Sequence, residues 1–205
     1  MTEFFVLGID PGFASIGWSV IRMDASGESL VELGVIRTEK STAKRNVRAS
    51  EDNLERAKEI AQELRALIDK YRVQLICAET MSYPRNSSAA AKMAMCWGVL
   101  AALAGQYNIP IAQATPQEVK KAVTGKKDAS KEEVQEAVRA LFTSLQGGEA
   151  KHGGPYVLRA VPRSLWEHPY DATAAVIACR ESEVFLLARR MVSCAASTKS
   201  SSPAT

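Results

Sequence analysis

One stretch near the start of the chain decides the fold: FFVLGIDPGFASIGWSVI, residues Phe4 to Ile21. An apolar run ends on Asp10, and a second run rich in aromatic and β-branched residues follows a Pro-Gly turn. Pro11 removes a backbone donor and Gly12 accepts unusual dihedrals, so the first strand stops there. We expect two paired strands with Asp10 at the end of the first. A carboxylate in that position suits binding a metal or a phosphate, although a solvated turn aspartate is also common before Pro-Gly.

Composition indicates one globular domain whose charge is compatible with nucleic-acid binding. The chain has 205 residues, of which 46% are hydrophobic and 24% charged, with a net charge of +3. This length supplies ample chain for a core. The mildly basic balance permits a nucleic-acid partner without demanding one, because the distribution of charge matters more than its sum.

Cysteine usage and the N-terminus indicate a cytoplasmic protein. The four cysteines are far apart and form no CxxC pair, which argues against a zinc site or a disulfide framework. The N-terminus has no basic region before its apolar run, so no signal peptide is expected. The longest apolar stretch, Ala94 to Gly105, is too short to cross a bilayer, and no membrane partner is expected.

The rest of the chain alternates between helical and strand patterns. A third strand is expected at Ser29–Ile36, and two further strands at 73–78 and 109–114. Helical spacing or capping signals predict helices at 53–71, from about 89 to 107, from Pro116, at 130–145 and at 171–192. The order β-β-β-α-β-α-β-α-α predicts an α/β fold: a mixed five-stranded sheet with helices on both faces.

Two segments interrupt this pattern. Residues 146–166 are rich in Gly, Pro and Arg and predict a long loop or insertion, and the Ser/Thr/Ala/Pro composition of residues 194–205 predicts a disordered tail. We therefore expect a single domain over residues 1–193.

Two predicted strands end in carboxylates, Asp10 and Glu79. If these strands are parallel neighbours, ~4.8 Å apart, both carboxylates lie at the same edge of the sheet. That spacing can serve one or two divalent cations, whose usual separation is roughly 3.5–4 Å. Two bare carboxylates so close would repel, and a cation is the natural counter-charge.

A third acidic residue begins the last predicted helix, in the run His168-Pro169-Tyr170-Asp171. The i,i+3 spacing of His168 and Asp171 puts both on one helical face. The side chains that follow, of Ala172, Thr173 and Ala174, are small, so this helix can pack close to a sheet. Its first turn could then place Asp171 at the same edge. Taken alone, Asp171 also fits a helix-start carboxylate favoured by the helix dipole.

These motifs resemble those of the RuvC-type Holliday-junction resolvases of the RNase H-like nuclease superfamily. Gly8-Ile9-Asp10-Pro11-Gly12 resembles the opening motif of that family, and Ala78-Glu79-Thr80-Met81 its second acidic motif. Residues 115–141 resemble its basic segment, and residues 168–172 its last motif, including the variant with His three residues before Asp. The resemblance runs in order from about Phe5 to Ala178.

The resemblance implies a function. It implies Mg²⁺, two ions with Mn²⁺ able to substitute, held by Asp10, Glu79 and Asp171, with His168 as a ligand or proton handler. It implies a crossover junction endodeoxyribonuclease that acts as a homodimer and nicks two strands of a four-way DNA junction symmetrically. In a bacterium such a protein would be associated with the nucleoid, and a phage-encoded one would act in the host cytoplasm.

DNA contacts are expected from cations near the motifs. Lys120 and Lys131 match positions where the family carries functional lysines. The other expected contacts are Tyr83, Arg85, Lys121, Lys126 and Lys127. Interspersed acidic residues also allow a solvated helical face. The family often places an aromatic wedge at the position of Ser82, so Tyr83 is a candidate for stacking in its place.

Three alternatives stay open from the sequence. The protein could be a relaxed nuclease of flaps and forks, or a junction-binding protein that does not cut. It could also be an actin-like nucleotide-binding protein, whose Gly-Ile-Asp opening is similar, although no second phosphate-binding signature follows here. Residues 146–166 are compatible with a lid, a DNA-contacting loop or a partner site.

Overall fold

The structure, a computed structural model, describes residues 3–41, 48–81, 85–146, 157–158 and 162–199. Its centre is a mixed sheet in the order β5-β4-β1-β2-β3-β6. Strands β1, β2 and β3 form an antiparallel meander, whereas the β1–β4, β4–β5 and β3–β6 pairs are parallel. The strand bounds are β1 Phe4–Asp10, β2 Ser15–Asp24, β3 Gly27–Arg37, β4 Leu75–Glu79, β5 Ile111–Ala114 and β6 Val157–Leu158.

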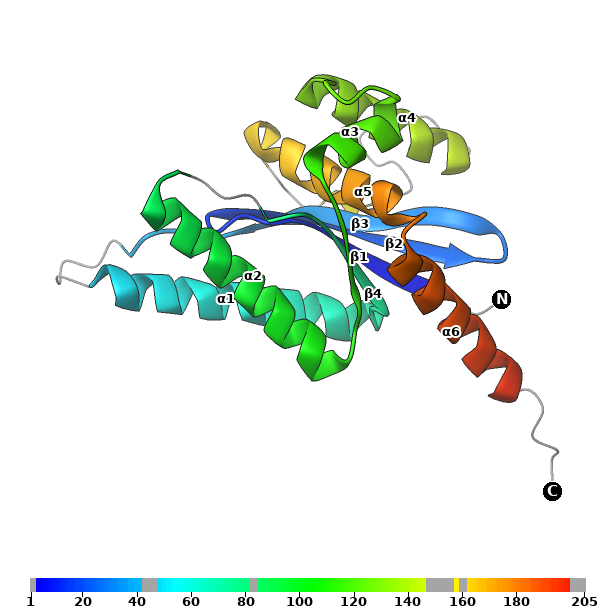
Figure 1. The fold of residues 1–205 in the computed structure, drawn as a ribbon, viewed down its shortest axis with the longest axis horizontal. Coiled ribbons are helices and arrows are strands. Elements are labelled where there is room, and N and C mark those ends of the chain that lie inside the picture. The colour runs from blue at the N-terminus through cyan, green and yellow to red at the C-terminus, as the bar shows by residue number, and fades with distance from the viewer. Residues whose placement is uncertain (1–2, 42–47, 82–84, 147–156, 159–161, 200–205) are drawn as a thin grey trace.

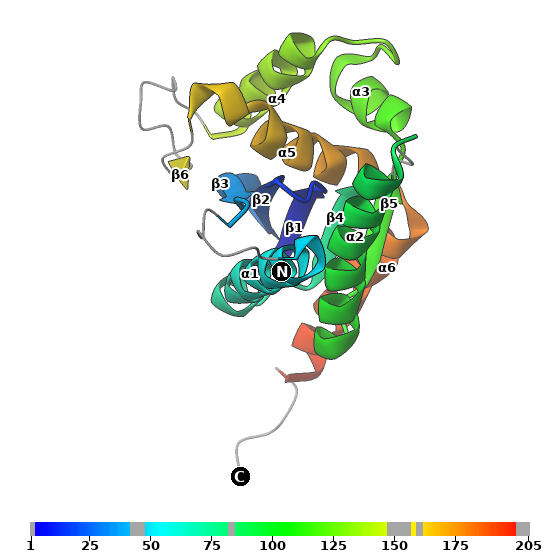
Figure 2. The ribbon, with the colours of Figure 1, turned by 90° about the vertical axis from the view of Figure 1, so that its left-hand side faces the viewer.

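Helices cover both faces of this sheet, as Figures 1 and 2 show. Helices α3, α4 and α5 lie on one face, α1 and α2 lie on the other, and α6 extends from the β5 edge. The helix bounds are α1 Ala49–Tyr71, α2 Ser87–Tyr107, α3 Pro116–Thr124, α4 Lys131–Gln146, α5 Glu167–Cys179 and α6 Glu183–Lys199, with a 3₁₀ turn η1 at Arg163–Leu165. The RNase H-like arrangement expected from the sequence is confirmed.

The pleat of the sheet assigns its side chains to two cores. Val6 and Cys77 face the α5 layer, whereas Ile9 and Ala78 face the α1–α2 layer. Ile9 pairs with Ala78 in the parallel β1–β4 register, so the next residues, Asp10 and Glu79, both turn towards α5. The register thus brings two carboxylates to the same end and the same face of the sheet.

Helix α5 lies unusually close to the strands beneath it. Nine of its 13 residues are buried, and most of these are small. A Cβ added to Gly8 would lie 2.3 Å from the carbonyl oxygen of Ala172, and one added to Gly17 would lie 2.0 Å from that of His168. The two glycines therefore allow the helix backbone to touch the strands that hold the site.

Helix α2 is the crossover between the parallel strands β4 and β5, and it buries only Cys96, Leu100, Leu103 and Ala104. By length and composition it could cross a membrane. The expectation that the apolar stretch is too short was wrong, because it counted only Ala94 to Gly105, whereas the helix runs from Ser87 to Tyr107. However, α2 is connected at each end to a strand of the sheet, β4 and β5, and one such helix does not establish a membrane span.

Three boundaries differ from the sequence predictions. The single helix predicted last is two helices, because the chain turns after Cys179. Ser182 caps the start of α6, with its Oγ accepting from the Phe185 amide at 3.3 Å. Helix α6 runs to Lys199, so a disordered tail from residue 194 was wrong for residues 194–199, and residues 200–205 lie outside the described ones. The 146–166 segment contains β6 and η1, and β6 adds a sixth strand to the predicted five.

Candidate metal centre and nucleic-acid interface

A cavity of about 330 Å³ opens where β1 and β4 end beneath α5. All four predicted site residues line it, although they are distant in the chain. Its polar lining comprises Asp10, Ser15, Glu79, Lys120, Lys131, His168 and Asp171. The structure therefore brings the predicted carboxylates and the two family-type lysines to one pocket.

Each wall of the pocket comes from a different element. Asp10 and Glu79 are the last residues of β1 and β4, and His168 and Asp171 occupy the first turns of α5. His168 Nδ1 lies 2.8 Å from Asp10 Oδ2, which ties the start of α5 to the end of β1. This contact fixes the orientation of the imidazole ring.

The pocket concentrates negative charge in a partly buried space. Burial, and then the charges of Asp10 and Glu79, raise the pKa of Asp171 to about 7. Burial and the charge of Asp10 also raise the pKa of Glu79, which Lys120 partly offsets. The hydrogen bond to Asp10 raises the pKa of His168 and favours the imidazolium. The pocket therefore disfavours ionised carboxylates unless a cation joins them.

Within the described ranges, no three acidic, histidine or cysteine side chains lie close enough together to hold one ion. The four site residues share the pocket walls instead. The assignment of these residues as ligands stays a prediction.

A buried arginine that the sequence analysis missed fixes the turn after Asp10. Arg56 of α1 is only 6% exposed and donates to the carbonyl oxygen of Phe13 at 3.4 Å and to Thr38 Oγ1 at 3.0 Å. Thr38 Oγ1 donates to the same Phe13 oxygen at 2.7 Å, and the Arg56 guanidinium lies 4.6 Å from the Phe13 ring centre. These contacts join α1, the end of β3 and the turn, so two other elements hold the segment that follows Asp10.

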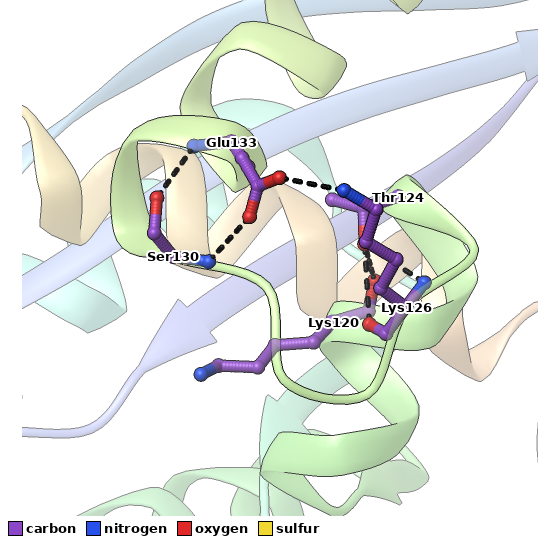
Figure 3. A network of polar contacts seen from close by, with 5 residues as sticks. All are labelled: Lys120, Thr124, Lys126, Ser130 and Glu133. Atoms are coloured by element: carbon purple, nitrogen blue, oxygen red, sulfur yellow. Dashed lines mark hydrogen bonds and ion pairs between the residues drawn. The ribbon is translucent and has the colours of Figure 1, made fainter.

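The two pocket lysines have different neighbours. Lys131 Nζ lies 3.0 Å from Glu167, an acidic residue that the sequence analysis also missed and that lies 4.0 Å from His168 Nε2. Lys120 contributes its carbonyl oxygen to the network between α3 and α4, while its side chain extends away from Thr124 and Lys126 (Figure 3). Lys120 and Lys131 are thus the expected DNA-contacting residues that lie at the pocket.

The other expected DNA contacts lie outside the pocket. Lys126 Nζ pairs with Glu133 at 2.9 Å, and Glu133 also accepts from the Ser130 amide, which confirms the predicted capping box (Figure 3). Lys126 therefore stabilises the α3–α4 connection. The exposed residues Lys121, Lys127 and Arg85 line no part of the cavity, and Tyr83 lies outside the described residues.

Comparison with known proteins places the chain in a family. The family model for the crossover junction endodeoxyribonuclease RuvC matches residues 6–151. The chain belongs to the RuvC family. The matched range contains Asp10, Glu79, Lys120 and Lys131. His168 and Asp171 follow that range, and helix α5 places them in the same pocket as the other four. RuvC proteins are metal-dependent endonucleases, a class that fits a pocket of carboxylates.

Individual relatives agree with this assignment. RuvC of Pseudothermotoga lettingae is 35% identical over 137 residues, which are 67% of this chain and 79% of the relative. The Thermus thermophilus RuvC structure superimposes with a TM-score of 0.63 at 24% identity, covering 85% of this chain and 92% of that one. The structure of T. thermophilus RuvC in complex with a Holliday junction substrate superimposes with a TM-score of 0.62 at 22% identity, again covering 85% of this chain and 92% of that one. These structural matches support the fold.

Proposed function

We propose that this protein resolves Holliday junctions by paired, symmetric, metal-dependent hydrolysis of phosphodiester bonds. The observation that carries the proposal is the single pocket shared by Asp10, Glu79, His168 and Asp171 in a chain of the RuvC family. One fold neighbour was solved with a Holliday junction substrate, which supports a four-way junction as the substrate here. The matched RuvC relatives are bacterial, which supports a cytoplasmic location, at the nucleoid if the chain is bacterial and in the host cytoplasm if a phage encodes it.

The donor set fits Mg²⁺, with Mn²⁺ as a substitute. Asp10, Glu79 and Asp171 supply hard carboxylate oxygens, and burial together with the neighbouring carboxylates raises the pKa values of Glu79 and Asp171 more than Lys120 and Lys131 lower them. Two such ions bound by these residues would supply a nucleophilic water and counter-charge for the developing and leaving oxygens of a phosphodiester. We assign Asp10, Glu79 and Asp171 as ligands.

The chain's own residues complete the chemistry. His168 is held by Asp10 through Nδ1, which leaves Nε2 on the side of Glu167. We assign His168 to holding or moving a proton at Nε2, or to ligating through it. Lys120 and Lys131 lie beside the carboxylates in the same cavity and are placed to bind the phosphates next to the cut. Arg85, Lys121, Lys127, Lys126 and Tyr83 are proposed as outer DNA contacts.

Helix α2 supports a homodimer, which symmetric cleavage requires. Its exposed face repeats small residues at heptad spacing: Ala91, Ala94, Gly98, Ala101 and Gly105. A Cβ added to Gly98 or Gly105 would meet nothing within 4 Å, so this side of the helix is open. Small residues at this spacing allow two helices to approach closely, and α2 from a second copy fits that face.

The test compares cleavage of a mobile four-way junction, a flap and a linear duplex, with and without Mg²⁺, read at nucleotide resolution. We expect paired nicks at symmetric positions in the junction only. Equal cleavage of flaps or forks would support the relaxed nuclease instead, and binding without nicks would support a non-cutting junction binder.

The site assignment has its own test. Asp10→Asn, Glu79→Gln and Asp171→Asn should each reduce cleavage more than about 100-fold, since even outer partners of metal ligands contribute 10–100-fold. Junction binding should persist, because the lysines supply it. Asp69→Asn, on the exposed face of α1, is the matched control and should cleave like the wild type. Near wild-type cleavage by any of the three variants removes that residue from the site.

A further inference from the structure

Two arginines stack on one tryptophan beside the start of α5. The Arg139 guanidinium of α4 lies 5.2 Å from the Trp166 ring centre, and that of Arg163 in η1 lies 5.6 Å from it. Arg139 also lies 5.0 Å from the Tyr170 ring centre and donates from Nε to the Tyr170 hydroxyl at 3.1 Å. We call Arg139, Arg163, Trp166 and Tyr170 the arginine–tryptophan cluster.

The cluster carries two positive charges without a carboxylate. Among the described residues, neither guanidinium lies within 4.0 Å of an Asp or Glu oxygen, and the neighbouring Glu167 is paired with Lys131 instead. Stacking on an indole holds a guanidinium plane and leaves its N–H edge available, the arrangement that suits a phosphate. Arg163 is exposed, so an anion can reach it from solvent.

Helix α4 connects the cluster to the pocket, because it contains both Arg139 and the pocket residue Lys131. Arg139 follows Lys131 by eight residues on α4, which corresponds to roughly 12 Å at 1.5 Å per residue. DNA advances about 3.4 Å per nucleotide along its axis, so that length corresponds to about three or four nucleotides. Trp166 is also followed directly by Glu167 and His168, which connects the cluster to the pocket through the chain.

We propose that Arg163 and Arg139, stacked on Trp166, form a second phosphate-binding site that holds the DNA strand about three or four nucleotides from the cut. The inference rests on the proposed function, since the strand must first enter the pocket. It gives a role to the described end of the 146–166 segment: Arg163 and Trp166 form a DNA-contacting element rather than a lid.

The first test replaces the exposed arginine. Arg163→Gln in the full-length protein should weaken junction binding about three- to tenfold in EDTA. It should also make the slope of log K against log salt shallower by about 0.9, the value for one lost phosphate contact. Arg163→Lys should keep the slope and lose part of the affinity. Arg65→Gln, on α1 across the sheet, is the matched control and should change neither quantity.

The second test neutralises the phosphates. Single methylphosphonates placed at each of the first six phosphates on either side of the cut should weaken wild-type binding at a position three or four nucleotides away. The same modification should have no further effect on Arg163→Gln, because both changes remove one contact. Additive losses, or an Arg163→Gln variant with wild-type affinity and salt slope, would show that the cluster is structural only.

The two proposals fail in different ways. If the wild-type protein nicks junctions in Mg²⁺ and Lys131→Ala flattens the salt slope while Arg163→Gln does not, only the cluster assignment is wrong. If the wild-type protein binds junctions through Arg163 and never cuts them, the proposed function is wrong and the phosphate site stands.

Discussion

Helices α5 and α2 have similar compositions and opposite environments. Both are rich in alanine and apolar overall, yet nine of the 13 residues of α5 are buried and only four of the 21 in α2. In α5 the small residues bring the helix backbone against Gly8 and Gly17 of the sheet. In α2 the corresponding small face is open.

The difference teaches what small residues do in this fold. They permit close approach to a partner, and the part of the chain that the structure describes supplies that partner for α5 but not for the small face of α2. The close contact of α5 assembles the pocket within one chain, and the open face of α2 is assigned to a second copy. The following predictions test that contrast, in decreasing order of expected effect.

Gly17→Ala tests the close contact of α5. The new Cβ would lie 2.0 Å from the His168 carbonyl oxygen, which is backbone and cannot rotate away. We expect a loss of about 3 kcal/mol in the free energy of unfolding, measured with urea, and a loss of cleavage as His168 moves. Gly105→Ala on α2 meets nothing within 4 Å and should stay within about 1 kcal/mol of wild type. Equal effects of the two changes would contradict the contrast.

Arg56→Ala tests whether the α1–α2 layer also supports the site. Removing a buried guanidinium leaves the Phe13 oxygen with one donor fewer and should cost about 2 kcal/mol of stability. If Arg56 positions the turn after Asp10, the variant should also need a higher Mn²⁺ concentration for half-maximal cleavage. Arg56→Lys should need a concentration between those of Arg56→Ala and the wild type. A stability loss with an unchanged metal requirement would limit Arg56 to a structural role.

Asp171 makes stability depend on pH when no divalent ion is present. Its pKa of about 7 lies above the ordinary 3.8, so the native state binds more protons than the unfolded chain across that window. The stability from the neutral carboxyl is therefore lost as pH rises through 7. Asp171→Asn stays neutral and should exceed the wild type by about 2 kcal/mol at pH 8 in EDTA, and by much less at pH 5. Urea unfolding at both pH values checks this, and a pH-independent difference would contradict it.

Gly98→Leu tests the open face of α2. A bulky side chain in a close helix–helix contact should raise the dimer dissociation constant at least tenfold, about 1.4 kcal/mol, as measured by sedimentation equilibrium. Ala140→Leu, also at an exposed helix position, is the matched control and should leave the constant unchanged. A Gly98→Leu dimer of wild-type strength would place the interface elsewhere.

Lys126→Ala should have the smallest effect. Lys126 pairs with Glu133 on the surface, where solvent screens the attraction between the two charges. We expect no resolvable change in stability and a smaller change in the salt slope of junction binding than for Lys131→Ala. A larger effect than that of Lys131→Ala would reverse the ranking of the two lysines.

The pocket could be predicted because strand ends and helix starts have strong local signals. Asp10 precedes Pro-Gly, Glu79 ends an apolar run, and His168 and Asp171 share the i,i+3 face at a helix start. The alternation of side chains along parallel strands then places both strand-end carboxylates on one face.

The rest depends on contacts between distant segments. Arg56 looks like any charged residue on an amphipathic helix, and only the fold shows that it reaches Phe13 and Thr38. Strand β6 has two residues, too few to form a pattern, and Ser182 was the one local signal for the break between α5 and α6. Likewise, the pairing of Glu167 with Lys131 joins residues 36 apart in sequence.

The most direct test of the central claim is the position of Mn²⁺ in crystals of the protein, located by anomalous diffraction. The account predicts anomalous peaks within the pocket, in ligand contact with Asp10, Glu79 and Asp171. Peaks elsewhere, or a pocket without manganese in a protein that cleaves junctions with Mn²⁺, would contradict it.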